Sequence, residues 1–549
     1  MAMVNYLNMY RNGDSDQMTP DPDRPDQVKN NAGGYVFKLD DWGVLDRFLI
    51  LGSESNTYYC SAKELTIKNA QNILKLLDMD GKRVVDRVVE ISQAGRAPKN
   101  DPAIFVLALA ASHKDNSVRS YALKNVASVA RTGTHLFQFI NYCNKLRGWG
   151  RALRRTISEW YTEKDLRSLV YQVMKYKSRC GWTHRDVLRK AHPQPKNYAQ
   201  NFIFKTIANG FAPDIDESNS ILELINAEHE IKRYYIAMNL RKLFGNDVDK
   251  IAQAIVQYDL PREVIPTNLL NEPKIWEALL EVDMPYTAML RNLGKMSSVG
   301  VFENASACAR VVNKLTNKEA IKGSRIHPVN ILIARLTYSS GQGYRGSNRW
   351  PVNERIENAL EEAFYESFNY LEPSNKRHLV ALDVSSSMLG STVRGLDFVS
   401  AAVVSAAMAM TMLKKEKEEH IKIMAFSDHL IEAPINRNMS LQEVFNKIIH
   451  ISFGATDCAL PMIYATENKI PIDVFTIWTD NETWYGSIKP HKALQIYREK
   501  MGINAKLISC GITATDFTIA DPMDPGMLDI VGFDSAVPQL IDEFSMRSI

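Results

Sequence analysis

Two hydrophobic patterns divide the chain at about residue 370. Before that point, apolar positions recur at the three- and four-residue spacing of amphipathic helices, and few strand-like runs interrupt them apart from 35–39. Glycines and prolines such as Gly81, Pro98 and Gly133 separate the helical segments. The predicted helices cover 63–79, 82–93, 102–112, 117–130, 134–146, 150–160, 163–177, 184–191 and 197–208. This spacing is typical of stacked helix pairs, so we predict an all-α solenoid of HEAT-like repeats.

The last third of the chain alternates continuous apolar runs with helical segments. Strand-like runs begin at residue 379 and then occupy 421–426, 471–478 and 505–512, with helices expected at 398–413, 440–450 and 489–500. Strands that alternate with helices form a parallel sheet covered on both faces, and such strands are apolar throughout for that reason. We therefore predict a multidomain chain in which a doubly wound α/β domain follows the helical region.

The domain limits follow from these patterns. Residues 1–30 are polar and rich in proline and are expected to be loose. The helical-repeat domain is assigned to 31–372 and the α/β domain to 373–549. Within the helical part, 338–352 is rich in glycine and serine, which is consistent either with a flexible loop near nucleic acid or with an ordinary surface loop.

Oxygen-bearing side chains follow the strands of the predicted sheet. Asp383, Ser385 and Ser387 form an Asp-x-Ser-x-Ser turn after the first strand. Thr456 lies in a later Gly-Ala-Thr-Asp turn, and Asp480 comes directly after the strand-like run 471–478 and Thr479. Taken alone, the first turn is more typical of an ordinary serine-rich turn after a strand than of a metal site. Three such segments meeting at the carboxyl edge of a parallel sheet favour a divalent metal site. Hard oxygen ligands suit Mg²⁺ first, with Mn²⁺ or Ca²⁺ as alternatives.

The charge is distributed unevenly along the chain. The formal net charge of the whole sequence is only +3. The window 131–210 holds sixteen Lys and Arg against four Asp and Glu, a net charge of +12, which leaves −9 for the remainder. Such asymmetry predicts that one region of the protein presents a surface to a polyanion.

Helical spacing gathers these cations onto faces. Arg151, Arg154 and Arg155 lie at i, i+3 and i+4. Two further pairs, Lys175 with Arg179 and Arg185 with Arg189, lie at i, i+4, and His192 follows Arg189 by one turn. One basic face is more often plain solvated surface, but three consecutive faces with few acids favour nucleic acid. Trp149, Tyr171, Tyr176 and Trp182 could stack on bases, although each is individually more typical of a core. The candidate RNA-binding residues are Arg151, Arg154, Arg155, Lys175, Arg179, Arg185, Arg189 and His192.

Other classes of function find less support. No nucleophile elbow, zinc-protease helix, phosphate-binding glycine loop or dinucleotide turn occurs, so we expect that the protein is not an enzyme. Its six cysteines (60, 143, 180, 308, 458 and 510) lack C-x-x-C spacing, and no signal peptide opens the chain. These observations favour a location in the reducing cytoplasm. We expect no membrane partner, because the apolar run 398–413 is too short to span a bilayer.

The α/β layout and its five oxygen-bearing residues resemble a von Willebrand factor A domain with a metal-ion-dependent adhesion site. Over 33–549 the chain resembles the Ro ribonucleoprotein autoantigen family, which is built on the TROVE domain. The resemblance rests on strings that include GGYVFKLDDWGVLDRFLILGSESNTYY, WGRALRRTISEWY, KYKSRCGWTHRDVLRKAHP, MPYTAMLRNLGKM, LDVSSSM, GATDCALPMIYA and FTIADPMDPGMLDIVGFD. The match is looser over 211–270.

The resemblance implies a ring of HEAT-like helices closed by the A domain, acting as a monomer with RNA. Such proteins bind small non-coding Y RNAs on a basic outer surface and take single-stranded 3′ ends of misfolded or unprocessed RNAs into the central opening, in RNA quality control. The family's Y RNA contacts fall here on Lys175, Arg179 and His192. Its direct metal ligands fall on Ser385, Ser387 and Thr456, with Asp383 and Asp480 acting mainly through water. The alternative function is a metal-dependent adhesion module that recruits a protein partner such as a nuclease.

Overall fold

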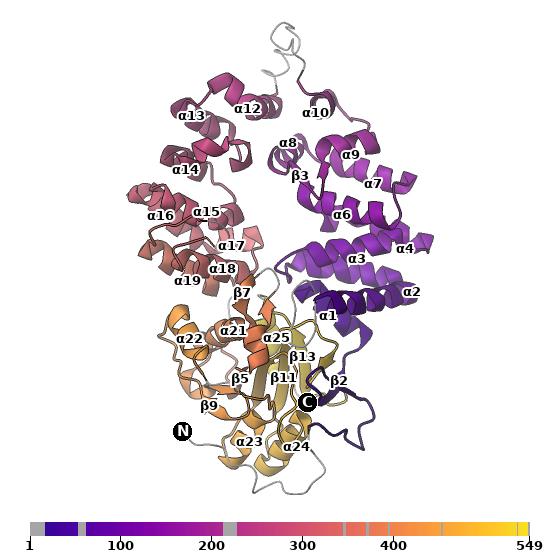
Figure 1. The fold of residues 1–549 in the computed structure, drawn as a ribbon, viewed down its shortest axis with the longest axis vertical. Coiled ribbons are helices and arrows are strands. Elements are labelled where there is room, and N and C mark those ends of the chain that lie inside the picture. The colour runs from indigo at the N-terminus through magenta and orange to yellow at the C-terminus, as the bar shows by residue number, and fades with distance from the viewer. Residues whose placement is uncertain are drawn as a thin grey trace.

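Two arms of helices rise from a C-terminal α/β domain (Figure 1). The computed structural model describes residues 17–52, 62–211, 228–343, 347–368, 373–393, 396–451, 454–534 and 536–546. This architecture confirms the predicted fold class of an all-α helical-repeat ring followed by a von Willebrand factor A-like domain.

The first arm begins with a helix that rests on the α/β domain and continues outward as packed helix pairs. Its helices are α1 (Asp41–Leu51), α2 (Ala62–Ala94), α3 (Asp101–Ser112), α4 (Asn116–Lys124), α5 (Val126–Val129), α6 (Gly133–Leu146), α7 (Arg151–Thr162), α8 (Leu166–Lys175), α9 (His184–Ala191) and α10 (Tyr198–Asn209). The expected break at Gly81 is a kink at Asp80 within α2. A side chain at position 81 would collide with Val118, so glycine lets α2 and α4 approach closely.

The second arm returns from the far end of the molecule to the α/β domain. Its helices are α12 (His229–Phe244), α13 (Val248–Tyr258), α14 (Pro273–Glu281), α15 (Tyr286–Ser298), α16 (Ala305–Leu315), α17 (Lys318–Ser324), α18 (Pro328–Ser339) and α19 (Glu354–Glu366). The described part of 338–352 is held in place, because the Trp350 ring stacks on Tyr338 and its indole N–H donates to the Tyr338 carbonyl at 2.9 Å. This packing favours the plain surface loop.

The two arms touch at both ends, which closes the ring. At the far end α8 packs against α12 and against the 3-10 turn Arg262–Val264. Near the α/β domain, the Asn330 side chain of α18 donates to the carbonyl of Pro98, just before α3, at 3.3 Å. Segments more than two hundred residues apart in sequence are therefore neighbours (Figure 1).

The α/β domain contains a six-stranded sheet in the order β13-β11-β10-β5-β8-β9, in which only the edge strand β9 runs antiparallel. The strands are β5 (His378–Asp383), β8 (Ile421–Phe426), β9 (Leu430–Glu432), β10 (Val474–Thr479), β11 (Lys506–Gly511) and β13 (Met527–Val531). The central strands β5, β10 and β11 are buried throughout, as the apolar runs predicted. A small hairpin joins β6 (Thr392–Val393) to β7 (Leu396–Ser400).

Helices cover both faces of this sheet. They are α20 (Ser386–Gly390), α21 (Ala401–Lys415), α22 (Leu441–Ile448), α23 (Leu460–Glu467), α24 (Pro490–Met501) and α25 (Val537–Met546). The apolar side chains of α21, α22 and α25 belong to a core that is continuous with the core of the helical ring. Those of α23 and α24 form a separate core on the opposite face. Among the described residues, the apolar core of one sheet face is thus shared with the ring.

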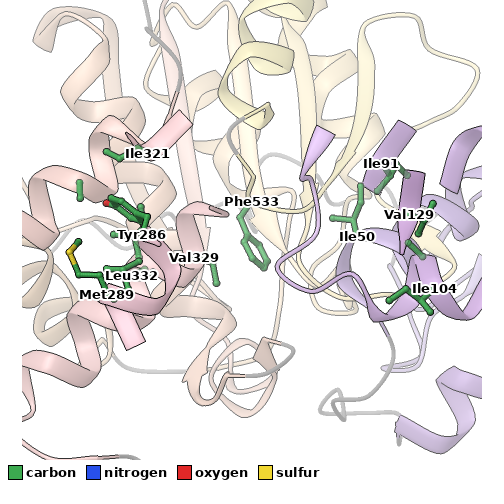
Figure 2. Close-up of a cluster of buried hydrophobic side chains, with 14 of the residues drawn as sticks. Ile50, Ile91, Ile104, Val129, Tyr286, Met289, Ile321, Val329, Leu332 and Phe533 are labelled. Atoms are coloured by element: carbon green, nitrogen blue, oxygen red, sulfur yellow. The ribbon is translucent and has the colours of Figure 1, made fainter. Parts of the chain in front are cut away.

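Phe533, in the turn after β13, lies between the two arms (Figure 2). It is 1% exposed, and its ring meets the His327 ring edge-on at a centroid distance of 5.6 Å. Figure 2 shows it between Ile50, Ile91, Ile104 and Val129 of the first arm and Tyr286, Met289, Ile321, Val329 and Leu332 of the second arm. Phe533 is therefore a buried contact between the α/β domain and both arms.

The N-terminal segment differs from the expectation of a loose tail over residues 1–30. Residues 1–16 lie outside the described part of the chain, but 17–30 lie against the α/β domain. Here β1 (Gln27–Lys29) pairs with β2 (Tyr35–Lys38), and β2 pairs with β12 (Phe517–Thr518) of the α/β domain. Polar composition predicted disorder, but these polar side chains find partners in the α/β domain, such as the buried Asp21 with Lys492 at 2.8 Å.

Two further expectations concern the cysteines and the membrane. The described cysteines are all free; four are buried and Cys180 is exposed, whereas Cys60 lies outside the described residues. Within the described ranges, no helix has the length and apolar composition that a bilayer crossing requires.

Candidate metal centre and candidate nucleic-acid interface

The five predicted metal-site residues gather at the carboxyl edge of the sheet. Asp383 ends β5, Ser385 and Ser387 lie at the start of α20, and Asp480 directly follows β10. Strands β5 and β10 are neighbours, and the chain leaves them in opposite directions across the sheet. Loops diverge at such a point and leave a site between them. Thr456 reaches this edge from the loop before α23.

Hydrogen bonds fix the oxygens of this cluster. The Ser385 N–H donates to Asp383 Oδ1 at 2.9 Å, and the Ser385 and Ser387 hydroxyls are 3.0 Å apart. The Thr479 hydroxyl donates to the other Asp383 oxygen at 2.7 Å, which ties β10 to β5. All five predicted residues are at most 2% exposed. The cluster is therefore a preformed set of buried oxygen atoms.

Burial disfavours the charged forms of the two carboxylates. Burial first, and then the nearby Asp480 charge, raise the pKa of Asp383 to about 7. Burial also raises the pKa of Asp480, although the Ser387 hydroxyl partly opposes this. No described Lys, Arg or His forms an ion pair with either carboxylate. A cation at this edge would relieve the repulsion between the two buried carboxylates.

The described residues contain no group of three or more His, Cys, Asp and Glu suited to a metal. Any ion at the sheet edge would therefore rely on the hydroxyls of Ser385, Ser387 and Thr456 together with two carboxylates. Neutral hydroxyl and carboxylate oxygens fit a hard ion such as Mg²⁺ and do not fit zinc or copper.

The basic face of α7 is formed as predicted. Arg151, Arg154 and Arg155 are exposed, whereas Leu153 and Ile157 on the other side are buried. Only Arg155 has an acidic partner among the described residues, Glu159 at 3.8 Å. The helix therefore presents at least two guanidinium groups to solvent without a neutralising carboxylate.

The basic face of α9 is partly engaged within the protein. Arg185 Nε and Arg189 Nη2 both donate to the Ala208 carbonyl at the end of α10, at 3.0 and 3.1 Å. Both side chains remain exposed and retain other donors. The Ser158 hydroxyl of α7 lies 3.2 Å from the Ala191 carbonyl at the end of α9, so the two helices adjoin.

Lys175 and Arg179 do not share a helix face, which corrects the reading of their i, i+4 spacing. Helix α8 ends at Lys175, and Arg179 lies in a hairpin of β3 (Ser178–Arg179) and β4 (Trp182–Thr183). The Lys175 ammonium donates to the Tyr171 hydroxyl at 2.6 Å, near the second arm, whereas Arg179 is exposed. The left-handed backbone of His192 ends α9 and exposes its ring.

A further cationic group was missed by sequence reasoning. The Lys190 ammonium lies 5.6 Å from the centre of the Trp149 ring and 5.3 Å from that of Trp182. These rings are half-buried and flank the α7 and α9 faces. Because Trp149 and Trp182 are far apart in sequence, only the fold shows that one lysine contacts both.

A cavity of about 280 Å³ opens where the two arms meet above the α/β domain. Lys99 and Arg131 line it from the first arm, and Arg291 and Arg325 line it from the second. Burial and the neighbouring Arg325 charge lower the pKa of Arg131. Asp101 is the acidic residue in this lining. The cavity therefore carries a net positive charge drawn from both arms.

Comparison with known families covers nearly the whole chain. A TROVE domain matches residues 28–337, and a Ro60 vWA domain matches residues 377–545. The chain belongs to the Ro60 family of TROVE-domain proteins. The predicted family resemblance is thereby confirmed.

Relatives in this Ro60 family are similar over almost their full lengths. The RNA-binding protein RO60 of Caenorhabditis elegans is 37% identical, covering 94% of this chain and 90% of the relative. The RNA-binding protein RO60 of Deinococcus radiodurans is 38% identical, covering 95% and 96%. The crystal structure of the Deinococcus radiodurans RO (RSR) protein has a TM-score of 0.67 and 36% identity, over 92% of this chain and 99% of that one.

In this Ro60-family chain, the N-terminal segment supports the loops of the oxygen cluster. The Gln17 amide donates to Asp457 Oδ1 at 2.7 Å and accepts from the Thr483 hydroxyl at 2.5 Å. The Thr483 hydroxyl oxygen also lies 3.3 Å from the Thr456 carbonyl oxygen. The Asn31 amide and the Ala32 N–H donate to Glu482, two residues beyond Asp480. Sequence reasoning missed these contacts because they join positions more than four hundred residues apart.

Proposed function

We propose that this chain is an RNA-binding protein of RNA quality control. In this proposal small structured Y RNAs bind the outer basic surface of α7 and α9, and single-stranded 3′ ends of misfolded or unprocessed RNAs enter between the arms. The observation that carries the proposal is the row of exposed arginines at 151, 154, 185 and 189 on two adjoining helices. Both curated relatives carry the name RNA-binding protein.

Phosphate chemistry supports the outer surface as the main contact. Guanidinium groups that are exposed and have few acidic partners can neutralise backbone phosphates, and release of counterions then supplies most of the affinity. Lys190 with Trp149 and Trp182 adds an aromatic surface beside these cations. Such a surface recognises the shape and backbone of RNA more than its sequence.

The cavity between the arms supports the second part of the proposal. Its four cations come from both arms, so an RNA strand there would be held from two sides. A paired helix is wider than a single strand, and selection would therefore act on the accessibility of an end. The role is binding and discrimination rather than catalysis.

The oxygen cluster at the sheet edge supports a Mg²⁺ site. Ser385, Ser387 and Thr456 would bind the ion through their hydroxyls, with Asp383 and Asp480 acting through water. A bound ion would offer an open position to a carboxylate of a protein partner, such as a nuclease. This adhesion function is compatible with RNA on the helices, because the sheet edge and the α7–α9 face belong to different domains.

A salt-titrated binding assay tests the proposal. A hairpin RNA with a single-stranded 3′ tail and its blunt counterpart would be titrated against the wild type and Arg151→Ala/Arg154→Ala/Arg155→Ala. We expect weaker binding of both RNAs and a salt slope shallower by about 0.7–0.9 per lost phosphate contact. The variant Lys175→Ala/Arg179→Ala/His192→Ala tests the residues that the family resemblance selects.

The matched control removes three cations from the second arm, Arg241→Ala/Lys250→Ala/Lys274→Ala, which changes the net charge equally. If this control weakens RNA binding as much as the α7 variant does, the α7–α9 surface has no special role. Equal affinity for the blunt and tailed RNAs would contradict selection by end accessibility.

A further inference from the structure

A second, larger cleft lies at the junction of the ring and the α/β domain. Its volume is about 740 Å³, and three parts of the chain line it. The end of α2 contributes Ala94 and Gly95, the helices α17 to α19 contribute most of the wall, and α21 contributes Thr411, Lys414 and Lys415. The volume falls within the range of about 300–1,000 Å³ typical of small-molecule sites.

Cations outnumber acids in the lining of this junction cleft. Lys318, Lys322, Arg325, Lys414 and Lys415 face Glu319 and Glu366. Lys318 is paired with Glu366 at 2.8 Å, and Lys415 is 3% exposed and pairs with Glu416 and Asp542. These pairs account for two of the five cations.

The three remaining cations have no carboxylate partner among the described residues. Lys322, Arg325 and Lys414 are all exposed at the cleft. The Lys414 ammonium lies 4.4 Å from the centre of the Tyr365 ring, which holds it over the cleft wall without neutralising it. Three unpaired cations around one concave surface attract a ligand with several negative charges.

Apolar side chains adjoin these cations in the lining of the cleft. Ile321, Pro328 and Phe368 contribute an apolar wall, and the Tyr365 ring lies beneath the Lys414 ammonium. The cleft therefore combines unpaired cations with an apolar surface.

We propose that the junction cleft binds a phosphate-bearing ligand of nucleotide size. Lys322, Arg325 and Lys414 would contact the phosphate oxygens, and the apolar wall would contact the ring system. Arg325 and Lys322 belong to the ring and Lys414 to the α/β domain, so the ligand would bridge the two domains. The phosphates could belong to a free nucleotide or to an RNA strand, because Arg325 and Gly95 also line the cavity between the arms.

Calorimetry on the full chain tests the proposal. Pyrophosphate, ADP and a short single-stranded oligonucleotide would be titrated in buffer with a chelator, which keeps divalent ions from the sheet-edge cluster. The test variant Lys322→Gln/Lys414→Gln removes two unpaired charges. The control Lys417→Gln/Lys447→Gln removes two exposed lysines of the α/β domain outside the cleft.

We expect the test variant to weaken binding at least tenfold and the control to leave it unchanged. If the test variant weakens the binding of ADP or pyrophosphate, the ligand of the cleft is a free nucleotide or phosphate anion. If it weakens the binding of the oligonucleotide alone, the ligand is an RNA strand. If binding of no probe depends on Lys322 and Lys414, the proposal is overturned. The RNA-binding proposal would then still stand, because the α7–α9 arginines lie outside this cleft.

Discussion

Replacing Phe533 with alanine tests how the ring is joined to the α/β domain. The phenyl ring is 1% exposed, meets His327 edge-on, and lies between the ends of both arms (Figure 2). Burial lowers the pKa of His327 to about 3, so its ring stays neutral and packs as an aromatic group at ordinary pH. The substitution leaves a cavity that three packed surfaces cannot all close.

The expected loss is about 3–5 kcal/mol, the usual cost of a Phe→Ala change in a core. A neighbouring hydrogen bond between the two arms contributes about 0.5–1.5 kcal/mol. One example is the Asn330 contact with Pro98. The aromatic side chain should therefore outweigh any single polar contact at this junction.

Hydrogen exchange is the appropriate measurement, because a chain of several domains need not unfold in one step. In Phe533→Ala, amides of both α1 and α18 should exchange faster along with those of β13. The control Phe475→Ala removes an equally buried ring from the core on the opposite sheet face. It should accelerate exchange in β10 and α24 and spare α1 and α18. If Phe533→Ala affects β13 alone, the side chain does not join the arms.

Three further predictions follow from polar contacts of single side chains. Arg47→Met should destabilise the chain by about 3–5 kcal/mol in urea unfolding, because it leaves Asp529 buried without its 2.6 Å partner. Gln17→Ala should weaken Mg²⁺ binding about tenfold in calorimetry, because it frees the loops around the oxygen cluster, whereas Ser385→Ala should abolish binding. Asp165→Ala should cost about 1 kcal/mol, because Asp165 caps α8. Hydrogen bonds from the Ser168 side chain and backbone lower the pKa of Asp165. Its contribution is therefore present above the unfolded-state pKa of about 3.9 and is lost as the pH falls through the lower folded value.

Each of these predictions has a matched comparison. Adding Asp529→Leu to Arg47→Met should recover much of the lost stability, and no recovery would contradict the buried-charge explanation. Gln17→Glu keeps the side-chain length but loses the amide donor, so Mg²⁺ binding equal to wild type would exclude Gln17 as a positioning residue. For Asp165→Ala, a stability difference from wild type that persists unchanged at pH 2 would contradict the assigned role of the carboxylate.

The helices and the central strands were predictable because their signals are local. The 3.6-residue period of α7 and the continuous apolar run of β8 depend only on neighbouring residues. The edge elements β9 and β12 were missed, because three or two residues carry no readable period. Helix α8 was extended too far at its end, where the hairpin takes over at Ser178.

The oxygen cluster illustrates the same division. Asp383, Ser385 and Ser387 lie within five residues, so their convergence was readable from one turn, and Asp480 followed from strand order. Gln17 could not be connected to Asp457, because nothing local indicates which distant polar group a buried amide will meet.

The helical region, the parallel sheet, the family and the chemical types at each candidate site can be read from the order of the amino acids. The folded arrangement was needed to show that the N-terminal segment packs on the α/β domain, that Lys175 and Arg179 do not share a helix face, and that Lys322 and Lys414 face one cleft. Secondary structure follows from interactions a few residues apart, whereas the meeting of distant side chains depends on how whole elements pack and in which register.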